Sequence, residues 1–225
     1  MDGAPSLWDH SYNMIKNLLA TLLLPGKVLY RVQEPSTIFL TFDDGPNARH
    51  TPDVLDVLDQ HQVKATFFMV GRDVRLNAAV ATDVARRGHV LANHTLTHPR
   101  MDRLSTQARQ LEIEGMDDVI EGVGGQRAQG LFRPPYGHAS FRLIGQCLSL
   151  QRTVVMWSRD SYDFRATEDE VVQGFEKRAP VAGDILLFHD DSAVSASSLR
   201  RLIPRWKDAG LRFGTLRGHR QGGAQ

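Results

Sequence analysis

The chain has 225 residues, 41% of them hydrophobic, which suffices for one sizeable core and does not require a second domain. Its 27 Lys and Arg against 26 Asp and Glu give a net charge of +1, without the basic bias of a dedicated nucleic-acid binder. A single cysteine excludes an internal disulfide framework and a cysteine-rich zinc site.

Residues 1–36 are expected to form an N-terminal helical or extended segment. The apolar run at 18–24 ends at Pro25-Gly26 and is too short to span a bilayer. It also lacks the basic start and the small-residue cleavage site of a signal peptide. We therefore expect a helix packed on the domain, with peripheral membrane contact through residues 14–30 as the alternative. This favours a cytoplasmic protein, with envelope association as the alternative.

From residue 37 onward, short apolar runs alternate with longer helical patterns. The runs predict strands at 37–42, 65–71, 89–94, 130–132, 153–157, 184–188 and 211–216. The patterns between them predict helices at 51–61, 78–88, 105–122, 140–150, 167–178 and 197–209, with Thr51 and Ser105 as caps. This order predicts one α/β domain over 37–216 with about seven parallel strands buried on both faces. A closed or nearly closed (β/α) barrel fits best, and an open doubly wound sheet is the alternative. Residues 217–225 are predicted to be a flexible tail.

Polar side chains follow five of the predicted strands. In parallel α/β folds, reactive side chains gather at the carboxyl ends of the strands. Because these ends share one rim, we expect the five groups to lie close together. They are Asp43-Asp44, residues 93–98, residues 133–137, residues 158–163 and His189-Asp190.

His94 and His98 stand four residues apart, a spacing that lets two imidazoles converge on one ion. Such a pair alone is more often two unrelated surface histidines. A carboxylate from a neighbouring strand end changes that balance, because two imidazoles and one carboxylate with open positions form a catalytic divalent site. With Asp44 as the third ligand, the sequence predicts one divalent metal. Zinc is the first choice, and cobalt, nickel or manganese could substitute.

The paired aspartates then take different tasks. If Asp44 binds the ion, Asp43 lies beside a metal-bound water, whose pKa the cation lowers. A free carboxylate there can take the remaining proton as general base. Arg133, from another strand end, would hold Asp43 ionised and oriented. Considered alone, Arg133 would be better explained as part of a surface ion pair.

His189 follows a fully apolar strand, where a charged group needs a partner. It is either a core imidazole bonded to a backbone carbonyl or a general acid for the leaving group. An acid needs a raised pKa, and a carboxylate from Asp160 or Asp163 would supply it. Asp190 and Asp191 look like a solvated turn.

Residues 134–137, Pro-Pro-Tyr-Gly, form a rigid turn. Its backbone could aim an N–H at a developing oxyanion, or it could simply connect a strand to a helix. An oxyanion stabiliser and a leaving-group acid are what amide or ester hydrolysis needs. The residues therefore indicate metal-assisted acyl hydrolysis without naming the acyl group.

Five ordered motifs resemble the polysaccharide deacetylases of carbohydrate esterase family 4, which include the nodulation-type chitooligosaccharide deacetylase. The motifs are TFDDGP at 41–46, HTLTH at 94–98, RPPYG at 133–137, DSYDF at 160–164 and ILLFHD at 185–190. The resemblance implies a distorted (β/α) barrel with one divalent metal, usually zinc. It also implies a hydrolase that removes N-acetyl groups from N-acetylglucosamine-type residues of an oligo- or polysaccharide.

The resemblance implies a role for each motif residue. It agrees with Asp43 as base, with Asp44, His94 and His98 as ligands, and with Arg133 as the group that orients the base. It adds the Tyr136 backbone N–H in the oxyanion site and favours Asp163 over Asp160 as the partner of the acid His189.

The residues expected to contact the substrate are Pro135, Tyr136, Phe164 and Leu187. Phe164 departs from the family, which commonly has Trp there. Phe keeps an apolar wall but loses area and the indole N–H, so the departure bears on substrate fit.

Two other functions stay open. The same rim could serve a deformylase or related C–N amide hydrolase acting on a sugar-linked or small substrate. A non-catalytic glycan-binding barrel is the third reading, and the Asp43 carboxylate beside a metal triad argues against it. An N-acetylated glycan is the expected partner.

Overall fold

The computed structural model describes residues 27–124 and 130–217. Within these ranges the strands form one nine-stranded sheet in the order β1-β6-β5-β4-β3-β2-β8-β7, with β9 paired to β2. All eight pairings between these strands are parallel. The strands are β1 Val28–Leu29, β2 Thr37–Asp43, β3 Thr66–Met69, β4 Val90–Asn93, β5 Leu131–Phe132, β6 Thr153–Val155, β7 Arg159–Asp160, β8 Ile185–His189 and β9 Arg212–Gly214.

The sheet curls into a barrel because one stretch of chain joins its two ends. β6 pairs with β5, and a few residues later β7 pairs with β8. Between them, the Ser158 N–H donates to the carbonyl of Ile185 at 3.0 Å. The predicted single-domain (β/α) barrel is therefore confirmed, and the open doubly wound alternative is wrong. All seven predicted strands are present, and the two-residue strands β1 and β7 are additional.

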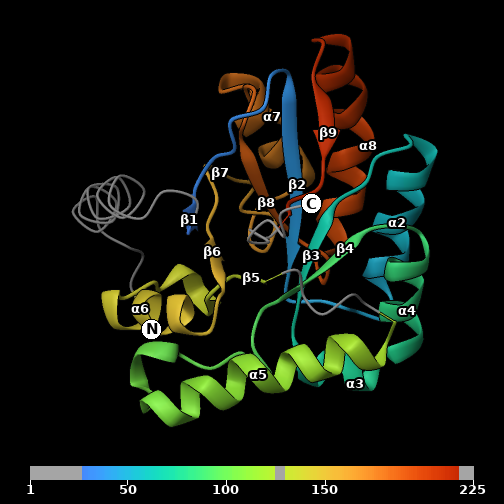
Figure 1. Cartoon of the computed structure of the whole chain (residues 1–225). Helices are drawn as coiled ribbons and strands as arrows, with labels where there is room; N and C mark the ends of the chain where they lie inside the picture. Colours follow the sequence, from blue (N-terminus) through green and yellow to red (C-terminus); the bar gives the residue numbers. More distant parts are fainter. Residues whose placement is uncertain (1–26, 125–129, 218–225) are drawn as a thin grey trace, which may run out of the picture.

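Helices cover the outer face of the barrel. In Figure 1, α2, α4 and α8 flank one side of the central strands, and α5 runs along the lower edge. The helices are α2 His50–Gln60, α3 Gly71–Leu76, α4 Ala78–Arg86, α5 Thr106–Gly122, α6 Phe141–Ser149, α7 Glu168–Lys177 and α8 Ala193–Asp208. Short 3-10 turns span Met101–Arg103 and Pro135–Gly137.

β2 is buried along its whole length and faces two cores. Ile38 and Phe42 belong to the large outer cluster under the helices. Phe39 belongs to the cluster inside the barrel. Because side chains alternate along a strand, Thr41 and Asp43 continue the inner face. The inner core thus turns polar at the carboxyl end of β2, where the candidate site begins.

The start of α2 differs from the prediction. Thr51 does not cap the helix, which begins at His50. The Asn47 side chain instead accepts from the N–H groups of Arg49 and His50, at 2.9 and 3.1 Å. Thr51 is fully buried and turned toward Asp190. Ser105 does cap α5, as predicted.

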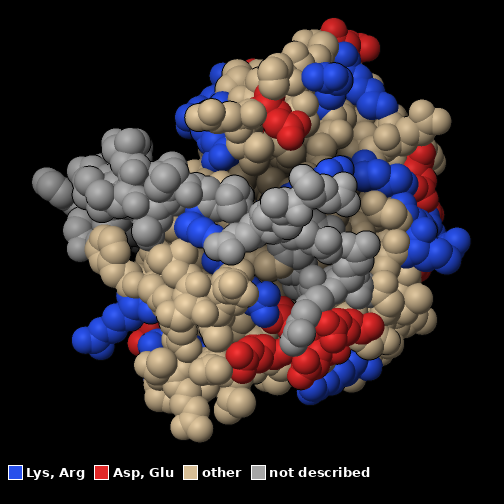
Figure 2. All heavy atoms as spheres, viewed as in Figure 1, with Lys and Arg blue, Asp and Glu red and all other residues tan. Residues whose placement is uncertain are grey.

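Some predictions fall on residues that the structure does not describe. The apolar helix is one of them over residues 14–26, and the tail is another over 218–225. In the described part of the chain, no helix is both long and apolar enough to cross a bilayer. Figure 2 shows a run of acidic side chains toward the bottom of the view, where α5 lies, with further acidic groups at the top and right and basic side chains on all sides.

Candidate active site

The candidate site lies at the carboxyl ends of β2, β4 and β8 and in the loops that follow. Asp43 and His189 sit opposite each other in the parallel register of β2 and β8. The Asp190 N–H also donates to the carbonyl of Asp43 at 3.3 Å. The parallel sheet therefore delivers the predicted polar groups to one rim.

Asp44, His94 and His98 converge on one point. Nε2 of His98 lies 3.1 Å from Oδ1 of Asp44, and Nε2 of His94 lies 3.4 Å from the same oxygen. The three ligand atoms are all within 4.8 Å of one another. The structure thus brings the predicted metal-ligand set together.

The donor set fits a divalent cation. Nδ1 of His94 is 2.7 Å from the carbonyl oxygen of Arg133, and since a carbonyl only accepts, the ring proton sits there. Nε2 is then free to face Asp44, whose buried Oδ1 receives no hydrogen bond from the described residues. Burial raises the pKa of Asp44, but the two imidazoles outweigh it and hold the pKa below its ordinary value. One anionic oxygen facing two imidazole nitrogens suits zinc or a related ion.

Left-handed backbone shapes the loop between the two histidines. Thr95 and His98 have φ angles of 74° and 60°, and Asp44 has 71°. Such positions cost on the order of 1–3 kcal/mol each for ordinary residues and persist only where the surroundings enforce them. Here the His98 N–H donates to Oγ1 of Thr95 at 3.0 Å, and the Thr95 N–H donates to Oδ1 of Asn93 at 2.9 Å. The loop therefore fixes His98 through its own side chains.

Asp43 is held by Arg133 inside the barrel. Arg133 is fully buried, and its Nη1 donates to Oδ1 of Asp43 at 2.6 Å and to Oγ1 of Thr41 at 2.9 Å. Its guanidinium lies over the Phe68 ring, 4.1 Å from the centroid. Burial lowers the pKa of Arg133, but the ordinary value is high enough to leave it cationic. The alternative of a surface ion pair is wrong.

The other oxygen of Asp43 points toward the metal-ligand set. Oδ2 of Asp43 lies 3.7 Å from Nε2 of His94. One oxygen is thus occupied by Arg133 while the second faces the position where an ion would sit. This is the placement expected of a base beside a cation.

His189 is paired with Asp163. Nδ1 of His189 donates to Oδ1 of Asp163 at 2.7 Å, and the His189 N–H donates to Oδ2 at 2.8 Å. Burial lowers the pKa of His189, but the Asp163 carboxylate outweighs it and raises the pKa to about 9. Asp160 instead accepts the N–H of Tyr162, and burial raises its pKa. Asp163 is therefore the partner, and the alternative of an imidazole bonded to a backbone carbonyl is wrong.

Two exposed aromatic rings flank the charged groups. The Tyr136 ring packs on His98 with centroids 4.8 Å apart, and Phe164 meets the His189 ring edge-on at 5.3 Å. Each is 59% exposed, although both are large. The other two predicted substrate contacts, Pro135 and Leu187, are buried. Two large rings are thus open to solvent beside His98 and His189.

A hollow of about 290 Å³ opens beside the metal-ligand set. It is bordered by Asp44 and His98 on one side and by the Arg72–Asp73 ion pair on another. Sequence reasoning missed Arg72 and Asp73, because they open a helix after an apolar strand and belong to no polar motif. The remaining lining residues are Pro46, Asn47, Val70, Asn77 and Asp191.

Asp190 is not part of a solvated turn. Only Asp191 is exposed, whereas Asp190 is 1% exposed and accepts the Thr51 hydroxyl at 2.5 Å. Burial raises the pKa of Asp190 to about 7. The carboxyl fits beneath Gly45, where even one added carbon would clash. An aspartate after a strand resembles a turn in sequence, and only the fold shows what covers it.

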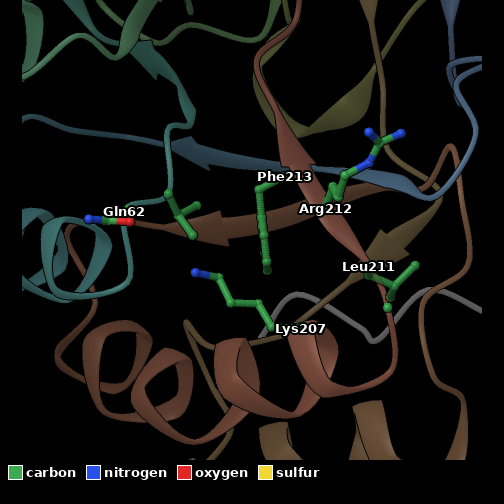
Figure 3. A pocket seen from close by; sticks show the side chains of 7 residues that line it. Gln62, Lys207, Leu211, Arg212 and Phe213 are labelled. Carbon is green, nitrogen blue, oxygen red and sulfur yellow. The ribbon is translucent and has the colours of Figure 1, made fainter.

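A larger hollow of about 440 Å³ lies away from this rim, and Figure 3 shows Lys207, Arg212 and Phe213 around it. Arg212 pairs with Thr37 at the start of β2. At about 3.3 Å per residue, Asp43 is roughly 20 Å away along the strand. None of the predicted site residues lines this hollow, so it is not part of the candidate active site.

Comparison with known proteins gives a consistent family. Residues 31–155 match the family model described as polysaccharide deacetylase. A peptidoglycan-N-acetylglucosamine deacetylase of Bacillus cereus is 31% identical over 80% of this chain, which spans 66% of that relative's length. A chitooligosaccharide deacetylase of Bradyrhizobium is 36% identical over 68% of this chain and 70% of its own.

A solved structure shares the fold along most of both chains. The Bc1960 peptidoglycan N-acetylglucosamine deacetylase, crystallised with a hydroxamate-type benzamide, superposes with a TM-score of 0.82. It is 28% identical, and the match covers 88% of this chain and 94% of the other. The chain belongs to the polysaccharide deacetylase family.

Proposed function

We propose that the protein is a metal-dependent hydrolase that removes N-acetyl groups from N-acetylglucosamine-type residues of an oligo- or polysaccharide. One observation carries the proposal. The ligand set of Asp44, His94 and His98 shares its rim with a carboxylate held by an arginine and an imidazole held by a carboxylate. A binding protein needs neither of those two pairs. Relatives named as deacetylases of peptidoglycan and of chitooligosaccharides support the substrate class.

Asp43 serves as the general base. A divalent cation bound by the ligand set would lower the pKa of a coordinated water toward neutrality. Oδ2 of Asp43 faces that position and takes the proton of the attacking water. Arg133 occupies Oδ1 and orients the carboxylate, so the other oxygen stays aimed at the reaction centre.

His189 serves as the general acid. A pKa of about 9 keeps the imidazole protonated at neutral pH. Its Nδ1 proton is engaged by Asp163, so Nε2 carries the proton that passes to the leaving nitrogen. As the C–N bond breaks, the amine takes this proton and the acyl carbon leaves as acetate. Asp163 orients the ring throughout.

The Tyr136 backbone N–H is proposed to stabilise the developing oxyanion. Tyr136 has a φ of 59°, which sets its peptide at an angle that an ordinary helical turn would not give. The exposed Tyr136 and Phe164 rings offer apolar faces to a sugar. A smaller ring at Phe164 than the family's Trp leaves more room beside His189.

The proposal is tested by measuring released acid over a panel of substrates. Purified zinc-loaded protein is incubated with N-acetylglucosamine oligosaccharides, peptidoglycan fragments and N-formylated sugars, and both acetate and formate are quantified. We expect acetate from the N-acetylated glycans. Formate without acetate would instead establish the deformylase alternative, and neither product would support the non-catalytic glycan-binding barrel. The Asp43→Asn variant is the matched control for contaminating activity.

A further inference from the structure

Asp190 is a buried carboxyl that the reaction does not use. It is 1% exposed, and its Oδ2 accepts one hydrogen bond from the Thr51 hydroxyl. Its Oδ1 has no partner among the described residues. Burying a polar group with so few hydrogen bonds costs stability, and an apolar side chain would avoid that cost. The contacts of this carboxyl should therefore explain why a costly buried group is present.

What it touches is the turn that carries the base and the first metal ligand. A Cβ added to Gly45 would lie 2.0 Å from the Asp190 carboxyl, so the carboxyl fills the space under that turn. The Asp190 N–H reaches the carbonyl of Asp43. Thr51, while donating to Asp190, accepts the N–H of Asn47 at 2.8 Å. Residues 43–47 are thus held at one end by the Asp190 N–H, in the middle by the Asp190 carboxyl and at the other end by Thr51.

We infer that Asp190 is a positioning residue for the metal site, which fixes the 43–47 turn so that the Asp44 carboxylate faces His94 and His98. The inference rests on the function proposed above, since it concerns the same ligand set. An apolar residue at 190 could fill the space, but the Thr51 hydroxyl would lose its 2.5 Å bond to the carboxyl and keep only the backbone carbonyl of residue 190, at 3.4 Å. The hydroxyl would then be held less firmly, and so would the Asn47 N–H that donates to it. Mutation of residues that orient metal ligands without binding the metal typically lowers metal affinity 10–100-fold.

The test measures zinc affinity by competition with a chromogenic chelator, without using turnover. We expect Asp190→Ala to bind zinc about 10–100-fold more weakly than the wild type. Asp190→Asn keeps an oxygen for Thr51 and should recover most of that affinity. Thr51→Val removes the hydroxyl with little change in volume and should weaken zinc binding in the same direction. Circular dichroism confirms that each variant is folded under the assay conditions.

Two matched controls separate positioning from general stability. Asp184 is as buried as Asp190 and lies just before the other end of β8. Its carboxylate accepts the Ser158 hydroxyl at 2.7 Å and forms ion pairs with Arg31 and Arg159, so its loss should cost stability without touching the 43–47 turn. Thr66 is as buried as Thr51 and accepts the N–H of Leu216. Asp184→Ala and Thr66→Val should keep wild-type zinc affinity. If Asp190→Ala fails to fold, the comparison of Thr51→Val with Thr66→Val decides alone.

The outcomes distinguish this inference from the proposed function. Wild-type protein that binds no zinc would overturn the proposed metal site itself. Wild-type protein that binds zinc, with Asp190→Ala or Thr51→Val binding it equally well, would overturn only the positioning role. Equal weakening in the Asp184 and Thr66 controls would overturn it too, because the effect would then follow from lost stability.

Discussion

Asp43 and Asp44 are adjacent in the chain but are held by different partners. Asp43 bonds to buried Arg133 at 2.6 Å, whereas Asp44 faces His98 at 3.1 Å and His94 at 3.4 Å. Two neighbouring carboxylates repel each other, and here one is offset by a guanidinium and the other by imidazoles and the cation they would share. Their tasks follow from their surroundings, since their chemistry is the same.

This division predicts that two matched substitutions both lower activity but differ in zinc content. Asp43→Asn should lower kcat about 10²–10⁴-fold, the usual contribution of a general base, while zinc content stays near that of the wild type. Asp44→Asn should lose zinc as well as activity, because the anionic ligand is gone. Zinc content by mass spectrometry, read beside acetate release, checks both. If Asp43→Asn also loses its zinc, the two roles are misassigned.

The His189 pair predicts how activity depends on pH. The protonated imidazole is the active form, so kcat should fall as pH rises through about 9. Asp163→Asn removes the charge that raises the pKa of His189, and the falling limb should move to lower pH. Rate profiles of both proteins between pH 6 and 11 are the measurement. A falling limb at the same pH in Asp163→Asn would show that another group titrates.

The same pair predicts a pH-dependent part of stability. His189 has a folded-state pKa of about 9, above the roughly 6.5 of an unfolded histidine. Its contribution to stability is therefore fully present below about pH 6.5 and is lost as pH rises toward 9. The His189→Gln variant, compared with the wild type by urea unfolding at pH 6 and pH 9.5, should show a smaller pH dependence in this window. An unchanged pH dependence would contradict the assignment.

How far the sequence predicted the site depends on the residue. Asp44, His94 and His98 could be predicted because parallel strands bring their carboxyl ends to one rim. The choice between Asp160 and Asp163 could not be made from the residues alone, because the two stand three positions apart after the same predicted strand. Burial of Asp190 depends on Thr51, which is 139 positions away, and no local pattern records that contact.

Among the elements, β2 anchors the site, because its outer face packs in the large core cluster and its last residue is Asp43. Phe42 is fully buried and stacks on Phe67 with centroids 4.8 Å apart, and the next residue is Asp43, the proposed base. The apolar outer face of β2 thus anchors the strand whose end carries the chemistry. Long, apolar elements such as β2 and β8 were predicted well. Strands β1 and β7 were missed because two residues carry no periodicity.

Phe42→Ala tests this support. We expect a loss of about 3–5 kcal/mol in the free energy of unfolding, as for other buried aromatic residues. Leu111 on α5 is 64% exposed, so Leu111→Ala is a control that should change stability by less than about 0.5 kcal/mol. Urea unfolding monitored by circular dichroism gives both values. A loss under about 1 kcal/mol for Phe42→Ala would mean that β2 is not anchored through its outer face.

At the scale of the molecule, closure of the barrel places five loops around one site. The barrel has a seam where the chain passes from β6, which pairs with β5, to β7, which pairs with β8. Arg31 forms an ion pair with Asp184 at 3.0 Å beside this seam. The order of strands and helices predicted the barrel but not this seam, because it depends on short irregular segments. The larger hollow lies at the opposite end of the barrel, and none of the predicted site residues lines it.

The central claim is that this rim hydrolyses an N-acetyl group with a divalent metal. The most direct test is acetate release from an N-acetylglucosamine oligosaccharide by the wild-type chain before chelation, after chelation and after zinc is restored. We expect chelation to abolish acetate release and added zinc to restore it. Acetate release that is unchanged after complete removal of metal would contradict a metal-dependent mechanism.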